Sequence, residues 1–98
     1  MDQIALTGSF VQQFGQESFT FFIGQQDSRY GIVSAGSWDT VLPFCFDEIR
    51  MDRGNRIIAQ HGGEQHVYRI VLTHHSVHAV REDASLWSAN RFAICLPA

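Results

Sequence analysis

Ninety-eight residues suffice for one domain with a single modest hydrophobic core, and we expect residues 1–98 to form one. The net charge of −3, with seven arginines, no lysine and no basic run, argues against nucleic acid as the main partner. No apolar run approaches the ~20 residues of a membrane span and no secretory signal opens the chain, so we expect a cytoplasmic protein that stays out of the membrane.

The first fifteen residues admit two interpretations. Phe10 and Phe14 are four residues apart, which fits one face of a short helix that ends at Gly15. The same segment has enough Phe and Val to form a strand instead. In either case we expect its apolar side chains to cover an open end of a sheet.

Residues 17–24 predict a strand, because Phe19, Phe21 and Ile23 alternate to one face while Phe22 points to the other. A polar turn at residues 25–28 then leads into a second strand, which makes Phe19–Val33 a hairpin.

The next stretch predicts a strand, a glycine turn and a returning strand. The turn contains Gly36, which can adopt a positive φ. Trp38 to Leu42 is expected to form the returning strand, and Pro43 to end it, because proline has no amide proton to donate to a sheet. The alternating pattern then resumes from Phe44 to Ile49.

The residues from Arg29 to Met51 resemble one unit of the bacterial WG-repeat family. The matching residues are Tyr30-Gly31-Ile32-Val33, Gly36, Val41-Leu42-Pro43, Phe46-Asp47 and Ile49. A tyrosine stands where that family usually has tryptophan, and the stretch from glycine to proline is longer than usual. The resemblance implies a β-rich scaffold and little chemistry.

A partial second unit extends from Arg56 to Val80. Its Tyr68-Arg69-Ile70-Val71 aligns in sequence with Tyr30-Gly31-Ile32-Val33 at a spacing of 38 residues, which is within the range of solenoid repeats. If Gly31 lets a backbone pack closely against an aromatic ring, then Arg69 predicts a looser or solvent-facing contact.

The second half repeats the hairpin pattern. A loop at residues 51–55 precedes a predicted hairpin from Arg56 to Leu72, with a glycine turn at residues 62–63. A helical turn is expected near residue 85, and a final strand from Phe92 to Leu96. The sequence therefore predicts an all-β or mainly β domain of antiparallel hairpins, forming a curled sheet or a partial barrel.

No catalytic or metal-binding residue is assigned from the sequence. His74 and His78 would share one face of a strand while His75 points away, so these histidines do not converge on a metal. Cys45 lies between two phenylalanines, and in a reducing cytoplasm both it and Cys95 are expected to be buried free thiols, with a disulfide between them as the alternative.

The paired carboxylates of Asp47 and Glu48 would point to opposite faces of a strand, so they cannot share a substrate. We therefore expect Asp47 to serve a turn or to accept backbone hydrogen bonds.

The binding residues are predicted from charges and tryptophans near turns. Arginines close to exposed aromatic residues are typical of protein interfaces, and tryptophan is enriched at their energetic centres. A solvated loop and a tryptophan folded back on the core are the alternative explanations. The predicted binding residues are Trp38, Arg50, Asp52, Arg53, His61, Glu64, His66 and Trp87.

The leading hypothesis is a small non-enzymatic protein, with no cofactor, that acts by binding another protein. Its size and acidity suit an inhibitor or immunity protein that blocks a partner enzyme. An exposed edge strand would permit strand addition or pairing into a homodimer. Two alternatives remain: a small metal- or thiol-dependent enzyme using Cys45 and the histidines, and a structural repeat that self-assembles.

Overall fold

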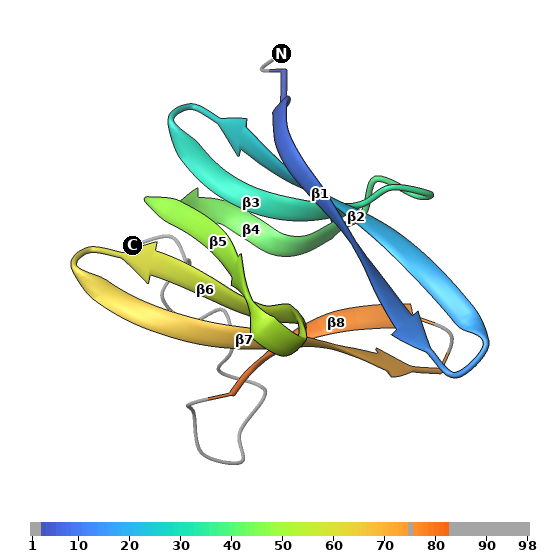
Figure 1. Ribbon diagram of the computed structural model, residues 1–98. Helices are drawn as coiled ribbons and strands as arrows, with labels where there is room; N and C mark the ends of the chain where they lie inside the picture. Colours follow the sequence, from blue (N-terminus) through green and yellow to red (C-terminus); the bar gives the residue numbers. More distant parts are fainter. Residues whose placement is uncertain (1–2, 75, 83–98) are drawn as a thin grey trace.

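The computed structural model describes residues 3–74 and 76–82. In this part of the chain, eight strands form two four-stranded antiparallel sheets, each with its strands in sequence order (Figure 1). The first sheet contains β1 (Ala5–Phe14), β2 (Glu17–Gln26), β3 (Arg29–Ser34) and β4 (Thr40–Phe46). The second contains β5 (Glu48–Asp52), β6 (Arg56–His61), β7 (Glu64–Thr73) and β8 (Ser76–Arg81). The mainly β prediction is confirmed, and the sheets do not close into a barrel.

One hydrophobic core joins the two sheets. Its buried side chains come from β2, β3 and β4 of the first sheet and from all four strands of the second. At its centre, the rings of Phe46 and Tyr68 meet edge to face, with centroids 5.8 Å apart. The chain passes from one sheet to the other through Asp47 alone, so the sheets are held close at this junction.

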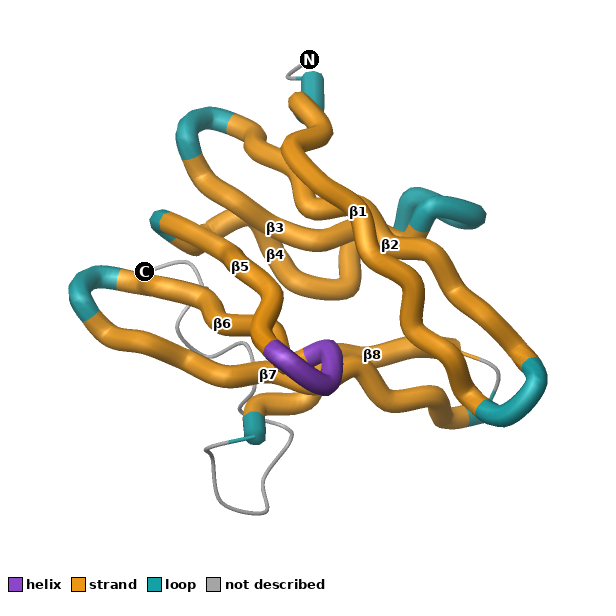
Figure 2. Tube along the Cα trace, viewed as in Figure 1, coloured by secondary structure: helices purple, strands orange, loops and turns teal. Residues whose placement is uncertain are grey.

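Short turns connect most of the strands (Figure 2). Gly62 and Gly63 both have positive φ, 57° and 86°, as a two-residue hairpin turn requires. The connection between β3 and β4 is longer and spans residues 35–39. The only helical element in the described residues is η1, a single 3-10 turn at Arg53–Asn55. In the same residues, no helix has the length and apolar character that crossing a membrane requires.

The N-terminal segment is a strand. β1 pairs with β2 from Ala5 to Phe14, with one irregularity between Leu6 and Gly8. The ring of Phe10 stacks on Phe21 of β2, with centroids 5.2 Å apart. Cross-strand pairing therefore decides between the two interpretations, and the helical alternative is wrong.

The prediction that Pro43 ends a strand is also wrong. β4 continues through this residue from Thr40 to Phe46, with register shifts in its pairing to β3. Proline is tolerated there because β4 is an edge strand, whose outward side needs no amide donor. The strand also begins later than expected, since Trp38 remains in the preceding loop.

The two tyrosine motifs both lie on the third strand of their sheets but are not equivalent. Tyr30 pairs with Gln25, two pairs from the β2–β3 turn, and is half-buried. Tyr68 pairs with Ile57, five pairs from the β6–β7 turn, and is fully buried. The 38-residue spacing therefore does not superimpose one hairpin on the other. The helical turn expected near residue 85, Trp87 and the final strand lie outside the described residues.

Candidate functional site

The first sheet has an outer face that points away from the core. Phe21 and Ile23 of β2 belong to the core, so the side chain of Phe22 between them points outward. Thr20, Phe22 and Gly24 alternate along β2, so all three positions face outward. Directly paired residues share a face, and Val11 pairs with Thr20 while Leu6 pairs with Gly24. Both apolar side chains of β1 therefore lie on the outer face with Phe22.

Trp38 joins this face from the loop between β3 and β4. Its indole ring stacks on Phe22, with centroids 5.5 Å apart and planes inclined by 26°. Val33, which pairs with Phe22, is only 1% exposed although it is outside the core between the sheets. The outer face therefore buries side chains separately from the core between the sheets.

Three large hydrophobic side chains stand out by their exposure in the described residues: Leu6 at 49%, Val11 at 56% and Trp38 at 55%. All three lie on the outer face of the first sheet. Large apolar side chains gathered on one face of a small protein are typical of an interaction surface.

Phe44 completes this face. A Cβ added to Gly31 of β3 would lie 2.8 Å from the Cγ atom of Phe44, so the ring lies directly over the glycine backbone. We call Leu6, Val11, Phe22, Trp38 and Phe44 together the outer apolar face.

Trp38 is held in a conformation that large side chains rarely adopt. Its φ is 61°, in the left-handed region. The Trp38 amide donates to the Ser34 carbonyl at 2.7 Å, and the Ser34 amide donates to the Asp39 carbonyl at 2.9 Å. The Ala35 amide donates to the carbonyl of Thr20 at 2.9 Å, which fastens the loop to β2. These bonds hold the loop in the geometry that presents the indole ring.

Two clefts lie beside this loop. One, of about 260 Å³, is bounded by β2, β3, β4 and the start of β8, and its lining includes Asp39 and Val77. The other, of about 510 Å³, lies along β2 and the loop. Both are lined by Phe19, Ser34 and Ser37. Only the second includes Thr20, which lies on the outer face, so this second cleft places hydroxyl groups beside the outer apolar face.

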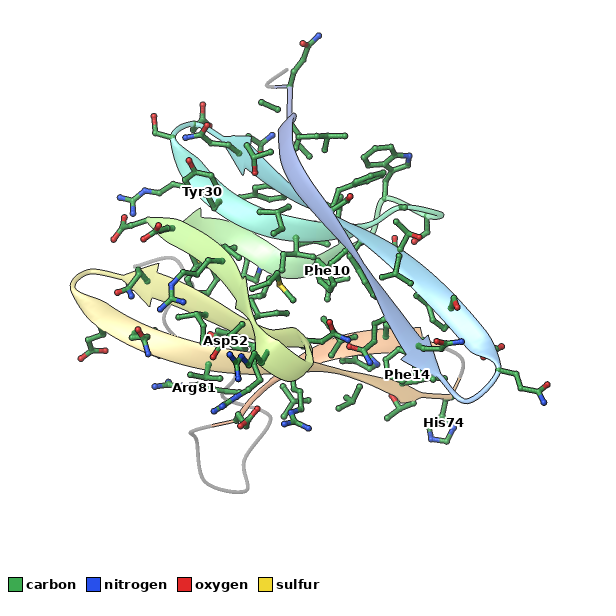
Figure 3. The ribbon with its side chains drawn as sticks, viewed as in Figure 1. Phe10, Phe14, Tyr30, Asp52, His74 and Arg81 are labelled. Atoms are coloured by element: carbon green, nitrogen blue, oxygen red, sulfur yellow. The ribbon has the colours of Figure 1, made fainter. Side chains whose placement is uncertain are left out.

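The residues predicted to bind do not form one site. Trp38 is on the β3–β4 loop, whereas Arg50, Asp52 and Arg53 lie on β5 and η1. Figure 3 shows Asp52, at the end of β5, away from Phe14 and His74 at the tips of the β1–β2 and β7–β8 hairpins. A third group, His61, Glu64 and His66, belongs to the β6–β7 hairpin.

His66 was predicted to be a binding residue, and the structure places it inside. Its side chain is only 1% exposed, and its Nε2 atom lies 3.6 Å from Oε1 of the exposed Glu64. His61 stacks edge to face against both His66 and Phe46, with centroid distances of 6.4 and 6.2 Å. His66 therefore packs in the interior, because residues alternating along β7 from Tyr68 face the core.

No group of three His, Cys, Asp or Glu side chains in residues 3–74 and 76–82 is placed to hold a metal ion. The expectation of a free thiol at Cys45 is wrong, because this half-buried cysteine is disulfide-bonded. The only other cysteine of the sequence, Cys95, lies outside the described residues. The disulfide leaves Cys45 without the thiolate that the thiol-enzyme alternative needs.

The sequence prediction included Trp38 but missed its neighbours on the outer apolar face. The alternation of β2 already directed Phe22 away from Phe19, Phe21 and Ile23, which was a usable signal. Leu6 and Val11 could not be assigned to a face while the first segment remained ambiguous between helix and strand.

Comparisons of the chain with protein-family models, with curated proteins and with solved structures found no match.

Proposed function

We propose that this chain is a small protein-binding module, and that its partner contacts the outer apolar face with Trp38 as the main anchor. The observation that carries the proposal is the half-exposed indole ring, stacked on Phe22 and held at a positive φ. Strained backbone at an exposed large side chain is typical of positions kept for function. Tryptophan is also enriched among the few residues that dominate binding energies.

The surroundings of Trp38 support the same role. Leu6, Val11 and the half-buried Phe44 extend the apolar surface, and the cleft along β2 adds hydroxyl groups at its border. An apolar centre with a polar rim is the usual anatomy of a protein interface. The small size and acidic charge suit an inhibitor or immunity-type protein.

A cytoplasmic setting remains part of the proposal, and the disulfide at Cys45 weighs against it. Disulfides persist mainly in oxidising compartments, because cytosolic thiol systems keep cysteines reduced. The binding role holds in either compartment, since it uses no thiol chemistry.

The experiment compares two surfaces. The immobilised chain captures partners from a lysate of its source organism, and the affinity of the main captured protein is measured by calorimetry. We expect Trp38→Ala to weaken binding by more than about tenfold, because truncating a central anchor costs upwards of ~1.4 kcal/mol.

Arg53→Ala is the matched control, because Arg53 is an exposed predicted binding residue on η1, away from the outer apolar face. Its affinity should stay within about twofold of the wild type, as expected for a residue outside the interface. If Arg53→Ala abolished binding and Trp38→Ala did not, the interface would be the charged loop and the proposal would be wrong.

A further inference from the structure

The strands at the sheet edges differ in how they discourage pairing with another chain. In the described residues, the edge strands are β1, β4, β5 and β8. β4 contains Pro43, β5 contains Glu48, Arg50 and Asp52, and β8 contains Arg81. Proline and charged side chains are the common protections of a sheet edge, because they oppose the addition of another strand.

β1 has neither protection. Its ten residues, Ala5–Phe14, include no charged side chain and no proline, and most of them are exposed. No strand in residues 3–74 and 76–82 pairs with its outer side (Figure 1). A long uncharged edge of this kind offers its backbone groups to a further strand.

We propose that two copies of this chain form a dimer by antiparallel pairing of their β1 strands. The proposal does not rest on the proposed function. A second copy is the favoured occupant because antiparallel self-pairing brings no like charges together on β1, whereas the other edge strands offer charges or proline.

The register of this dimer follows from the irregularity in β1. The regular pairing of β1 runs from Gly8 to Phe14, because the register shifts between Leu6 and Gly8. Full antiparallel overlap of this segment with its copy places Val11 opposite Val11 of the second copy, at the two-fold axis. Ser9 then faces Gln13 of the other copy on the same side of the sheet.

Val11 suits this central place. It is the most exposed of the large hydrophobic side chains in the described residues, at 56%, and it lies on the outer face. Opposed residues on antiparallel strands have Cβ atoms about 4.5–5.5 Å apart, so two β-branched valines would cover each other. The first sheets of both copies would continue into one eight-stranded sheet.

Sedimentation equilibrium tests the dimer. Edge pairing alone buries less than a standard interface, so we expect a weak dimer that forms between about 5 and 500 µM. Val11→Lys should raise the dissociation constant at least tenfold, because it sets two ammonium groups opposite each other. An equimolar mixture of Val11→Lys and Val11→Glu should restore the dimer, since the opposed charges then attract.

Thr20→Lys is the matched control. Thr20 is exposed, lies on the same face and pairs with Val11, but it is one strand further from the edge. It should leave the dissociation constant within about threefold of the wild type, because its charge lies away from the two-fold axis. If Thr20→Lys or Trp38→Ala dissociated the dimer as strongly as Val11→Lys, the copies would associate through their outer faces, and the proposal would be overturned.

Hydrogen exchange of the wild-type protein gives an answer that needs no variant. Raising the concentration should slow amide exchange in residues 8–14 more than elsewhere, because their outward amides become hydrogen-bonded. A monomer at every concentration, or slowing confined to other segments, would overturn the proposal.

Discussion

Gly24 and Gly31 are opposite each other on β2 and β3, and each lies beneath an apolar side chain. A Cβ on Gly31 would be 2.7 Å from the Leu42 carbonyl oxygen as well as 2.8 Å from the Phe44 ring. A Cβ on Gly24 would be 2.4 Å from Cγ2 of Ile4. The pair of glycines therefore lets Phe44 and Ile4 lie close against the backbone of the first sheet.

Gly31→Ala should destabilise the protein. The added methyl group collides with backbone as well as with a ring, so relaxation requires β4 to move, and we expect a loss of about 1–3 kcal/mol. The free energy of unfolding, measured by urea denaturation, checks this value.

Gly36→Ala is the control, because a Cβ there meets nothing within 4 Å and its φ is not positive. It should be neutral or stabilising by up to about 1 kcal/mol, since it reduces the freedom of the unfolded chain. Equal stability of the Gly31→Ala and Gly36→Ala variants would show that Phe44 does not rest on the glycine.

The role of Gly31 could be predicted in part from the sequence. The sequence led to a conditional prediction: if Gly31 lets a backbone pack closely against an aromatic ring, Arg69 makes a looser or solvent-facing contact. The condition holds, because the ring of Phe44 lies over Gly31, and the prediction is confirmed, because Arg69 is exposed and pairs with Oε2 of Glu82 at 2.9 Å. The aromatic partner could not be identified, because the shifted register between β3 and β4 determines that Phe44 covers Gly31.

At the scale of the elements, Asp47 fastens the junction between the sheets. Its amide donates to the carbonyl of Gln60 at 2.8 Å, and its Oδ2 atom accepts the amide proton of Gly62 at 2.9 Å. Its Oδ1 atom forms an ion pair with Arg29 at the start of β3. One carboxylate thus links the β4–β5 junction to two hairpins, and the predicted role as an acceptor of backbone hydrogen bonds is confirmed.

Asp47→Ala should lower the free energy of unfolding by roughly 1–2 kcal/mol, because it removes the acceptor of a turn amide and an ion pair together. Arg29→Ala removes only the ion pair, whose side chains are about half exposed. It should cost less than about 0.5 kcal/mol, and less still at high salt. Equal losses in both variants would mean that the hydrogen bond to Gly62 contributes nothing.

The N-terminal strand β1 shows why the spacing of apolar residues alone could not distinguish a helix from a strand. Phe10 and Phe14 are four residues apart, a spacing that places both on one face of a helix and equally on one face of a strand. In the structure they face the core side of β1, where Phe14 meets Phe19 edge to face at 5.8 Å. The choice between helix and strand depends on pairing with β2, which no local sequence pattern indicates. The hairpins β2–β3 and β6–β7 were predictable because their turns and alternation lie within one short stretch.

For the whole molecule, the two sheets depend on a common interior. The sequence predicted the strands better than their partition into two sheets, because the contacts of β4 with β6 and with β8 join residues distant along the chain. Phe46 ends β4 and contacts the buried ring of Tyr68 on β7, which makes it a direct link between the sheets. Both sheets should therefore unfold together.

Phe46→Ala tests this dependence. Removing a fully buried ring should lower the free energy of unfolding by about 3–5 kcal/mol, a large part of the roughly 5–15 kcal/mol typical of a domain. Amide exchange should accelerate in β5–β8 as well as in β1–β4, because the lost ring belonged to both layers. Phe22→Ala removes the same ring from the half-buried outer face and should cost less, since the core between the sheets remains intact. If β5–β8 kept wild-type protection in Phe46→Ala, the second sheet would be stable without the first, and the two would be separate folding units.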